Sequence, residues 1–479
     1  MEQIFFDPAD PRASLSQLPQ TAAVFALYGK EAHAEPYIGR TPNLRARLER
    51  LLQPSARHPR RLQLAGLVRR IAWQLTGSEF ESLLAQFTLL EEIYGARTPG
   101  RSAEKQPAQN QPAEKQSSER NSLARMHLRA PAFIRYLGGN PYPRIVVTNR
   151  PSQREAEWAY GPFASRASAE RYAEEALKLF LLRRCTDDLD PNPSHPGCVY
   201  SEMKMCLAPC YQGCTNQRYA EEAAAVERFL ATRGESRLVT LRAGRDQASA
   251  NLEFESAAAI HAQVQKVESV RALASELVRP MNQLQAVILQ AGAQPDEVAV
   301  FLFADGSLRG PAAFSTLGMR IQNEQSGSSS LFAHPMAIEP VLEDRDQRSE
   351  IRDQGSEIRD QESGLAQASA EYDVSGHDFS HAEGGQQNER ALAPEGIAAP
   401  PKTARGVLES RMEAALATLN EPPGPASATV RQAHLALLKR WYYRPEVRRA
   451  GEIFFPDAEG RWPVKAMLRG AGRVAAKML

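Results

Sequence analysis

Residues 1–97 alternate short apolar runs with amphipathic segments. The run Val24–Tyr28 predicts a strand, and Tyr37–Gly39 predicts the beginning of a second strand that ends in a turn. Apolar residues then recur with helical spacing in Leu44–Leu52 and in Ser78–Ile93. The pattern predicts a small block in which strands come first and helices follow.

Later apolar runs predict a second mixed block and a late β-hairpin. Arg144–Thr148 is expected to be a strand, and the chain becomes helical after Gly161-Pro162-Phe163. The turn dipeptide Asp305-Gly306 separates the apolar runs Val298–Phe303 and Leu308–Phe314, a pattern typical of a β-hairpin. Helical spacing returns in two later segments, Arg411–Leu419 and Ala433–Tyr443.

Two polar stretches interrupt these blocks. Residues 98–125 are rich in Gln, Pro, Ser and Lys and repeat Ala-Glu-Lys-Gln, and residues 321–404 repeat Arg-Asp-Gln at Arg345, Arg352 and Arg359. The seven-residue period of the second stretch has no apolar seam, so a coiled coil is not expected. Both stretches are predicted to be low-complexity segments that cannot bury enough surface to fold alone.

Charge is unevenly distributed along the chain. The net charge is only +1, but nine arginines and a single acid, Glu49, lie between Arg40 and Arg70. Such a block is typical of contact with nucleic-acid phosphates, although a solvated helix face would have the same composition. We treat the block as a candidate DNA-binding surface.

The chain contains no obvious targeting or membrane segment. No apolar stretch reaches the roughly 18 residues that cross a bilayer. Residues 1–12 are acidic and contain prolines, unlike a secretory signal. We therefore expect a cytoplasmic protein.

All five cysteines fall between Cys185 and Cys214. In a reducing compartment this clustering favours a metal or cluster site over disulfides. The candidate ligands are separated by twelve, seven and three residues: Cys185, Cys198, Cys206 and Cys210. Four thiolates suit tetrahedral zinc or an iron–sulfur cluster, and the spacing matches neither a zinc finger nor a common ferredoxin. Cys214 is a spare thiol that could compete as a ligand.

The segment from Pro36 to Leu48 reads Pro-Tyr-Ile-Gly-Arg-Thr-Pro-Asn-Leu-Arg-Ala-Arg-Leu. It resembles the second half of the GIY-YIG nuclease signature, as found in the UvrC family of DNA-repair proteins. In that family a divalent metal held by a glutamate polarises the scissile phosphate. The motif tyrosine helps to deprotonate the attacking water, and a helix arginine stabilises the pentavalent transition state.

The resemblance assigns these roles to residues of this chain. Tyr37 matches the tyrosine, Gly39 the glycine, Arg40 the usual lysine and Arg47 the helix arginine. Two further arginines of the basic block are expected to contact DNA, Arg45 and Arg50.

Three positions depart from the family pattern. Phe25 replaces the tyrosine of the first half of the signature, and Leu51 stands where another tyrosine is common. Gln86 occupies the position of the metal-binding glutamate, and a neutral amide is a poor ligand for a hard divalent cation. A magnesium or manganese ion at this site would need a substitute carboxylate, for which Glu79 and Glu81 are the candidates.

The cysteine segment Cys198–Cys210 closely resembles that of UvrC, as do Pro143–Arg150 and Gly161–Ser168 upstream. The resemblance implies a four-iron cluster, with zinc as the second possibility. Its expected role is to fix the domain and to present Arg183 and Arg184 to DNA.

Residues 248–260 resemble the UVR motif, a helix pair that docks the helicase UvrB. An apolar face on a short hairpin can be completed by a partner's helices. The expected face comprises Leu252, Phe254, Ala257, Ala258 and Val264. The alternative is a hairpin that packs only within its own chain.

The last third offers weaker signals. Residues 285–314 resemble the segment that leads into the RNase H-like nuclease domain of UvrC. No strand-borne carboxylates suited to a two-metal centre follow, so the second incision is not expected. Trp441-Tyr442-Tyr443-Arg444 would either stack on bases or form core, and core is the commoner fate of such aromatics.

These observations predict an α+β protein: a GIY-YIG three-stranded sheet with helices, a cysteine-cluster α/β domain and a UVR helical hairpin. The expected domains are a GIY-YIG domain (1–97), a linker (98–125), the cysteine domain (126–220), the UVR hairpin (221–280), a remnant preceding the RNase H-like domain (281–320), an insert (321–404) and a helical segment (405–479). Two functions remain open. One is a DNA endonuclease that makes the 3′ incision of nucleotide excision repair with UvrB. The other is an impaired scaffold that binds damaged double-stranded DNA and UvrB without cutting.

Overall fold

The computed structural model describes the chain in segments. They are residues 1–31, 34–53, 64–94, 125–149, 159–186, 188–317, 319, 404–421 and 426–478. All of them belong to one compact unit, which comprises residues 1–324 and 402–479. The predicted linker and insert lie almost entirely outside the described residues, as do Arg57, Arg60 and Arg61 of the arginine block.

The N-terminal module is a four-stranded antiparallel sheet in the order β1-β4-β2-β3. Its strands are β1 (Glu2–Phe5), β2 (Ala23–Gly29), β3 (Tyr37–Thr41) and β4 (Val68–Leu75). The prediction of three strands is wrong, because residues 2–5 pair along β4 and add a fourth. Helix α1 (Pro11–Ser16) and α2 (Leu44–Leu52) contribute to a core with Phe25 and Leu27 on one face of this sheet.

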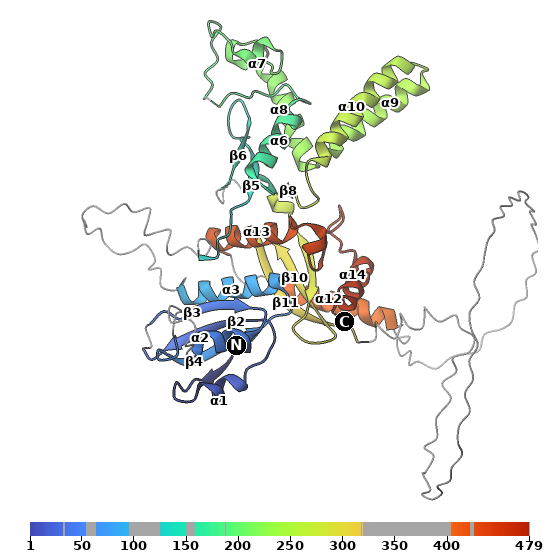
Figure 1. Ribbon diagram of the computed structural model, residues 1–479. Coiled ribbons are helices and arrows are strands. Elements are labelled where there is room, and N and C mark those ends of the chain that lie inside the picture. The colour runs from blue at the N-terminus through green and yellow to red at the C-terminus, as the bar shows by residue number, and fades with distance from the viewer. Residues whose placement is uncertain are drawn as a thin grey trace, which may run out of the picture. The chain divides into compact units, whose positions relative to one another are not determined.

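Helix α3 (Glu79–Tyr94) lies on the opposite face of this sheet, where Leu89 packs on Val24 and Ala26 (Figure 1). Ser78 Oγ accepts a hydrogen bond from Glu81 N–H at the start of the helix, as a capping residue does. Five further apolar residues of α3 are buried in a different core: Phe80, Leu83, Leu84, Phe87 and Leu90. A helix that is apolar on several sides is buried on several sides.

The middle domain has a second antiparallel sheet, ordered β6-β5-β7-β8. It consists of β5 (Ala132–Tyr136), β6 (Ile145–Thr148), β7 (Ala159–Phe163) and the two-residue β8 (Arg279–Pro280). Helices α6 (Arg166–Leu177) and α8 (Asn216–Ala231) contribute Tyr172, Tyr219 and Phe229 to its core. The cysteine segment lies between these helices in the chain and contains only α7 (Val199–Glu202) and the 3-10 turn η3 (Pro209–Tyr211).

Helices α9 (Glu235–Ala250) and α10 (Phe254–Ala272) form the predicted helical hairpin and run side by side in Figure 1. Its base packs on the middle domain through Leu238, Val264, Val267 and Val270. The chain then returns to pair β8 with β7, so the hairpin is an excursion from the middle sheet.

A third antiparallel sheet has the order β11-β10-β9-β12. It includes the predicted hairpin, β10 (Glu297–Ala304) and β11 (Ser307–Ser315), whose turn places Asp305 and Gly306 at φ 53° and 76°. The 3-10 turn η4 (Met281–Gln283) leads into β9 (Ala286–Ala291). The far C-terminal β12 (Glu452–Phe454) pairs with β9, and η5 (Glu446–Arg448) precedes it.

The C-terminal residues therefore complete this third sheet. Helices α12 (Ala404–Asn420) and α14 (Val464–Ala476) cover one face and pack on residues such as Val287, Val300 and Leu302. Helix α13 (Ala428–Tyr442) and α3 share a core with the alternate residues, such as Ile288, Phe301 and Phe303. This alternation follows from the two-residue period of a strand. The α+β class predicted from the sequence is confirmed.

Candidate nucleic-acid interface and cysteine centre

The strand pair β2–β3 positions the residues of the nuclease-type motif. Its register sets Gly39 opposite Phe25 and Tyr37 opposite Leu27, so these side chains share one face. Phe25 is fully buried, and its ring lies over Gly39 and 6.1 Å, centroid to centroid, from the Tyr37 ring. Tyr37 is 36% exposed, which leaves it accessible. The first tyrosine hydroxyl of the family motif is replaced here by a buried phenyl ring.

Helix α2 carries the predicted helix arginine. Asn43 caps the helix by accepting a hydrogen bond from Ala46 N–H, and its apolar side chains are buried at Leu44, Leu48 and Leu52. Arg47 is half-buried, and its side chain makes no hydrogen bond or ion pair with the residues that the structure describes. Its guanidinium is therefore available to an external anion.

Four neighbouring arginines are held by neutral groups rather than by acids. Arg45 donates to Leu18 O at 2.7 Å, Arg50 to Ala46 O at 3.1 Å and Arg69 to Val68 O at 2.7 Å. Arg70 donates to the Gln3 amide and stacks 3.9 Å above the Tyr28 ring. These contacts fix each side chain and leave its positive charge unneutralised.

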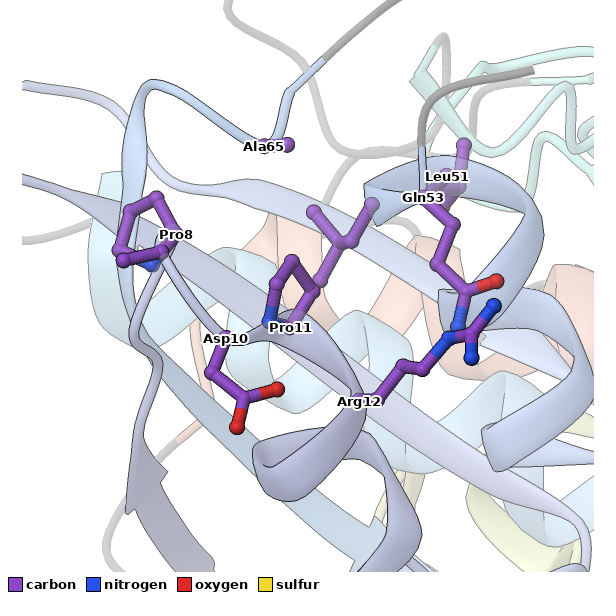
Figure 2. Close-up of a pocket in the computed structure, with 9 residues that line it drawn as sticks. Pro8, Asp10, Pro11, Arg12, Leu51, Gln53 and Ala65 are labelled. Atoms are coloured by element: carbon purple, nitrogen blue, oxygen red, sulfur yellow. The ribbon is translucent and has the colours of Figure 1, made fainter.

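Leu51 lies at a pocket of about 510 Å³ between the start of α1 and the end of α2 (Figure 2). Arg12 and Gln53 lie next to each other on one side of this pocket. The acidic residue that lines the pocket, Asp10, accepts a hydrogen bond from Ala13 N–H and so caps α1. The pocket offers a cation but no uncommitted acid beside the position where the family commonly has a tyrosine.

The two substitute carboxylates are both committed to other roles. Glu81 is buried, and its Oε2 accepts a hydrogen bond from Gly77 N–H at 2.8 Å, which helps to cap α3. Burial raises the pKa of this carboxyl, so its neutral form is favoured relative to an exposed glutamate. Glu79 forms ion pairs with Arg444 and Arg40.

The nuclease-type centre therefore does not fit a divalent metal. Gln86 is half-buried and neutral, and the two glutamates that precede it on α3 are committed elsewhere. Within the described part of the chain, no three His, Cys, Asp or Glu side chains are placed to hold one metal ion.

The cysteine segment is a tightly turned loop. Left-handed backbone conformations occur beside the thiols, at Gly197, Lys204, Ala208 and Gln212. Asn192 N–H donates to Cys210 O at 2.9 Å, and Arg183 Nη1 lies 3.5 Å from Cys185 Sγ. The backbone therefore reverses direction repeatedly between the cysteines.

The four candidate thiols lie within electrostatic range of one another. Burial raises the pKa of Cys206, a hydrogen bond from Ala208 N–H lowers it, and negative charge on the other three raises it further. Burial likewise raises the pKa of Cys210, where Tyr211 N–H is the opposing donor. All of these thiols are free rather than paired in disulfides.

Among the described residues, the four thiols do not form a group that is placed to hold a metal ion. Zinc needs four sulfurs at about 2.3 Å from a single centre, whereas a four-iron cluster attaches each sulfur to a different iron. A set of four thiolates is chemically suited to either group.

Two arginines proposed as DNA contacts differ in exposure. Arg183 is only 1% exposed, and its Nε donates to Tyr142 O, so it braces the cysteine segment from inside. Its assignment as a DNA contact is corrected, because a buried guanidinium cannot reach a phosphate. Arg184 is half-buried and donates to Leu177 O, with Tyr200 nearby.

The hairpin tip exposes apolar side chains. Leu252 is 72% exposed and Phe254 65% exposed, while Ala258 is exposed and Ala257 half-buried. Val264, expected on the same face, is instead buried in the core of the middle domain. The hairpin is thus anchored at its base and has an uncovered apolar tip.

Sequence reasoning missed the pairing of Arg444 with Glu79, which joins residues 365 positions apart. The motif Trp441–Arg444 had drawn attention to this segment, but for base stacking. Trp441 is 4% exposed and donates to Ala450 O, so the core alternative is confirmed for it.

Comparisons with known proteins agree with the motifs. A family model described as the UvrC/Cho excinuclease middle domain matches residues 133–229, from β5 into α8. UvrABC system protein C of Pseudomonas protegens is 26% identical over 265 residues, which cover 55% of this chain and 39% of that protein. The protein of the same name from Ruminiclostridium cellulolyticum is 25% identical over 324 residues, covering 67% and 48%. No solved structure matches.

Residues 133–229, which include the cysteine segment, are therefore similar to the middle domain of the UvrC/Cho class. More particularly, the similarity to UvrABC system protein C extends over about half of this chain, and the resemblance to the UvrC family is confirmed. The chain spans less than half the length of these relatives. Among the described residues, no helix is long and apolar enough to cross a membrane.

Proposed function

We propose that this chain is a nucleotide excision repair protein that binds damaged double-stranded DNA and a UvrB-type helicase without cutting the DNA itself. The similarity to UvrC supports the repair role at the level of the family. The proposal that the chain does not cut DNA rests on three residues at or near the expected metal site on α3. Gln86 replaces the ligand glutamate, Glu81 caps the helix and Glu79 is held by two arginines.

DNA binding is supported by the electrostatics of the N-terminal module. In the arginine block only Arg40 forms an ion pair with an acid in the described residues. Arg47 has no partner there, and the charges of Arg45 and Arg69 are held near the surface by main-chain carbonyls. When guanidinium groups neutralise phosphates, they displace the cations that are condensed on the DNA. This release makes DNA binding favourable and sensitive to salt.

A second candidate function is 3′ incision by the same module. It is favoured by Tyr37, which is exposed, and by Arg47, which is free to meet a phosphate. In such a reaction the Tyr37 hydroxyl would orient the attacking water and Arg47 would stabilise the charge of the pentavalent phosphate. The missing elements are the carboxylate at Gln86 and, to a lesser extent, the tyrosine hydroxyl at Phe25.

The decisive experiment is incision of a damaged, UvrB-loaded duplex in magnesium or manganese. We expect no cutting by the wild type and partial recovery by Gln86→Glu, with more recovery when Phe25→Tyr is added. Thr88→Glu, which adds the same charge to the same helix, is the control and should remain inactive. Cutting by the wild type would replace the scaffold proposal with the incision proposal.

We further propose that Cys185, Cys198, Cys206 and Cys210 hold a four-iron cluster. When bound, the cluster would cross-link a segment that has little regular structure, and the Arg183–Cys185 contact would adjust the charge at its edge. Iron and sulfide analysis after anaerobic purification should find about four of each per chain. Zinc alone, or no metal, would contradict the cluster. Cys214→Ser should leave the iron content unchanged, whereas Cys206→Ser should reduce it.

A further inference from the structure

The Glu79 carboxylate is surrounded by guanidinium groups from two distant parts of the chain. Arg444 Nη1 and Nη2 each lie 2.8 Å from a different oxygen of Glu79, which is the bidentate geometry of an arginine fork. Arg40 Nη1 approaches the same carboxylate at 3.4 Å. The charge of Arg440, one turn before Arg444 on α13, also acts on it.

This cluster carries an excess of positive charge. Arg444 and Arg40 share one carboxylate, and the charge of Arg440 acts on it as well. Hydrogen bonds from Arg444 lower the pKa of Glu79, so its ionised form is favoured. The side chains of Arg444, Arg40 and Glu79 are 28%, 32% and 41% exposed, so the cluster is open to solvent. A site in which two cations are held against one internal anion, with the charge of a third cation acting on it, attracts a further anion once the internal one moves away.

We propose that Arg40, Arg440 and Arg444 form a binding site for a phosphate of the DNA backbone, with Glu79 as a built-in competitor for that site. This rests on the proposed function, because it assumes that the chain binds DNA. An arginine fork accepts a phosphate with the geometry that it uses for a carboxylate. In the absence of DNA, Glu79 occupies the fork, and a backbone phosphate displaces it.

The arginines of this site come from two different parts of the chain. Arg40 belongs to β3 of the N-terminal module, while Arg440 and Arg444 lie on and just after α13 of the third sheet. A phosphate bound there touches both parts at once. DNA would then extend beyond the arginine block of the nuclease-type motif to the C-terminal residues, where the sequence had suggested base stacking rather than a phosphate contact.

The test is the affinity for a fluorescein-labelled duplex, measured by fluorescence anisotropy over a series of potassium chloride concentrations. Glu79→Gln should bind several-fold more tightly than Glu92→Gln, which removes the same charge from an exposed position on the same helix. Arg444→Gln should weaken binding several-fold and reduce the slope of log K against log salt by about one. Arg440→Gln should act in the same direction.

Arg444→Lys is a second variant that keeps the test valid if Arg444→Gln misfolds. It retains the positive charge and loses only the bidentate guanidinium geometry. It should bind with intermediate affinity and an unchanged salt slope. If the wild type binds DNA but Glu79→Gln matches Glu92→Gln, or the Arg444 variants match the wild type, the phosphate site is refuted and the proposed function stands. If the wild type binds no DNA at any salt concentration, both are refuted.

Discussion

At the scale of single residues, the space over Gly39 limits what the β2–β3 pair can hold. A Cβ atom at Gly39 would lie 2.7 Å from Cζ of Phe25, whose ring is buried and cannot easily withdraw. We expect Gly39→Ala to lower the free energy of unfolding by about 1–3 kcal/mol, because the added methyl overpacks this contact. Urea denaturation followed by circular dichroism measures the difference.

The matched control is Gly66→Ala, since a Cβ there meets nothing within 4 Å. It should be nearly neutral. Combining Gly39→Ala with Phe25→Leu should restore part of the lost stability if the phenyl ring is the obstacle. An additive double mutant would show that the cost of Gly39→Ala arises elsewhere.

His434 is a buried histidine whose titration affects stability. It is 7% exposed, its Nδ1 accepts a hydrogen bond from Leu308 N–H at 3.0 Å, and its ring packs on Phe87. Burial lowers its pKa to about 4, so the folded protein keeps it neutral. In the unfolded chain the pKa of this histidine is near 6.5. Between about pH 6.5 and pH 4 the unfolded state therefore binds more protons than the folded state.

We therefore expect His434 to contribute fully to stability above about pH 6.5 and to lose that contribution as the pH falls towards 4. The loss amounts to roughly 3 kcal/mol at most. His434→Gln retains an acceptor but does not titrate, so its stability should fall less over this range. Chemical denaturation of both proteins at several pH values compares them, and parallel curves would contradict the assignment.

At the scale of elements, the base of the α9–α10 hairpin is expected to contribute to stability and its tip to partner binding. Phe254 is exposed at the tip and Val267 is 1% exposed at the base. Phe254→Ala should change the free energy of unfolding by less than about 0.5 kcal/mol, whereas Val267→Ala should cost roughly 1–3 kcal/mol. A pull-down with UvrB should weaken only for Phe254→Ala among correctly folded variants. Unchanged capture would favour a hairpin that serves the chain's own packing.

Elements with strong local signals were predicted well. Helix α2 coincides with the predicted Leu44–Leu52, and the Asp305-Gly306 turn lies between β10 and β11 as expected. Strands β1 and β4 were not predicted, because their pairing joins residues about seventy positions apart and neither has clean alternation. The apolar face of α3 was predicted, but its contact with the third sheet depends on residues more than two hundred positions later.

In the candidate site too, local features were predicted from the sequence and long-range contacts were not. The register of β2 and β3 places Tyr37, Gly39 and Phe25 together, as the motif implies. The burial of Arg183 and the pairing of Glu79 with Arg444 depend on tertiary packing, which residue type and spacing do not reveal. Local chemistry is readable from the sequence, whereas the availability of a charged group is a property of the fold.

At the scale of the whole described unit, α13 and the residues just after it connect the three sheets. Phe80 of α3 contacts Trp441, and His434 bonds to β11. Tyr443 OH donates to Pro162 O at 2.9 Å in the middle domain, and Ser275 Oγ lies 2.9 Å from the same hydroxyl. Removing one such contact should therefore affect parts of the chain that are distant in sequence.

Phe80 provides the sharpest test of this coupling. Its ring lies 5.2 Å from Phe301 of β10 and 5.4 Å from Trp441, centroid to centroid, so it belongs to a core shared by the N-terminal helix and the third sheet. Phe80→Ala should cost about 3–5 kcal/mol. Hydrogen exchange should show reduced amide protection in both α3 and β10, because the cavity is common to both.

Leu89→Ala is the matched control. Leu89 is also buried on α3, but it packs on Val24 and Ala26 of the N-terminal sheet. Its truncation should reduce protection in β2 while β10 keeps more of its protection than in Phe80→Ala. Loss of protection confined to α3 in Phe80→Ala would mean that the helix and the third sheet unfold independently. The phosphate site built from Arg40 and Arg444 would then lack the fixed geometry that its two halves require.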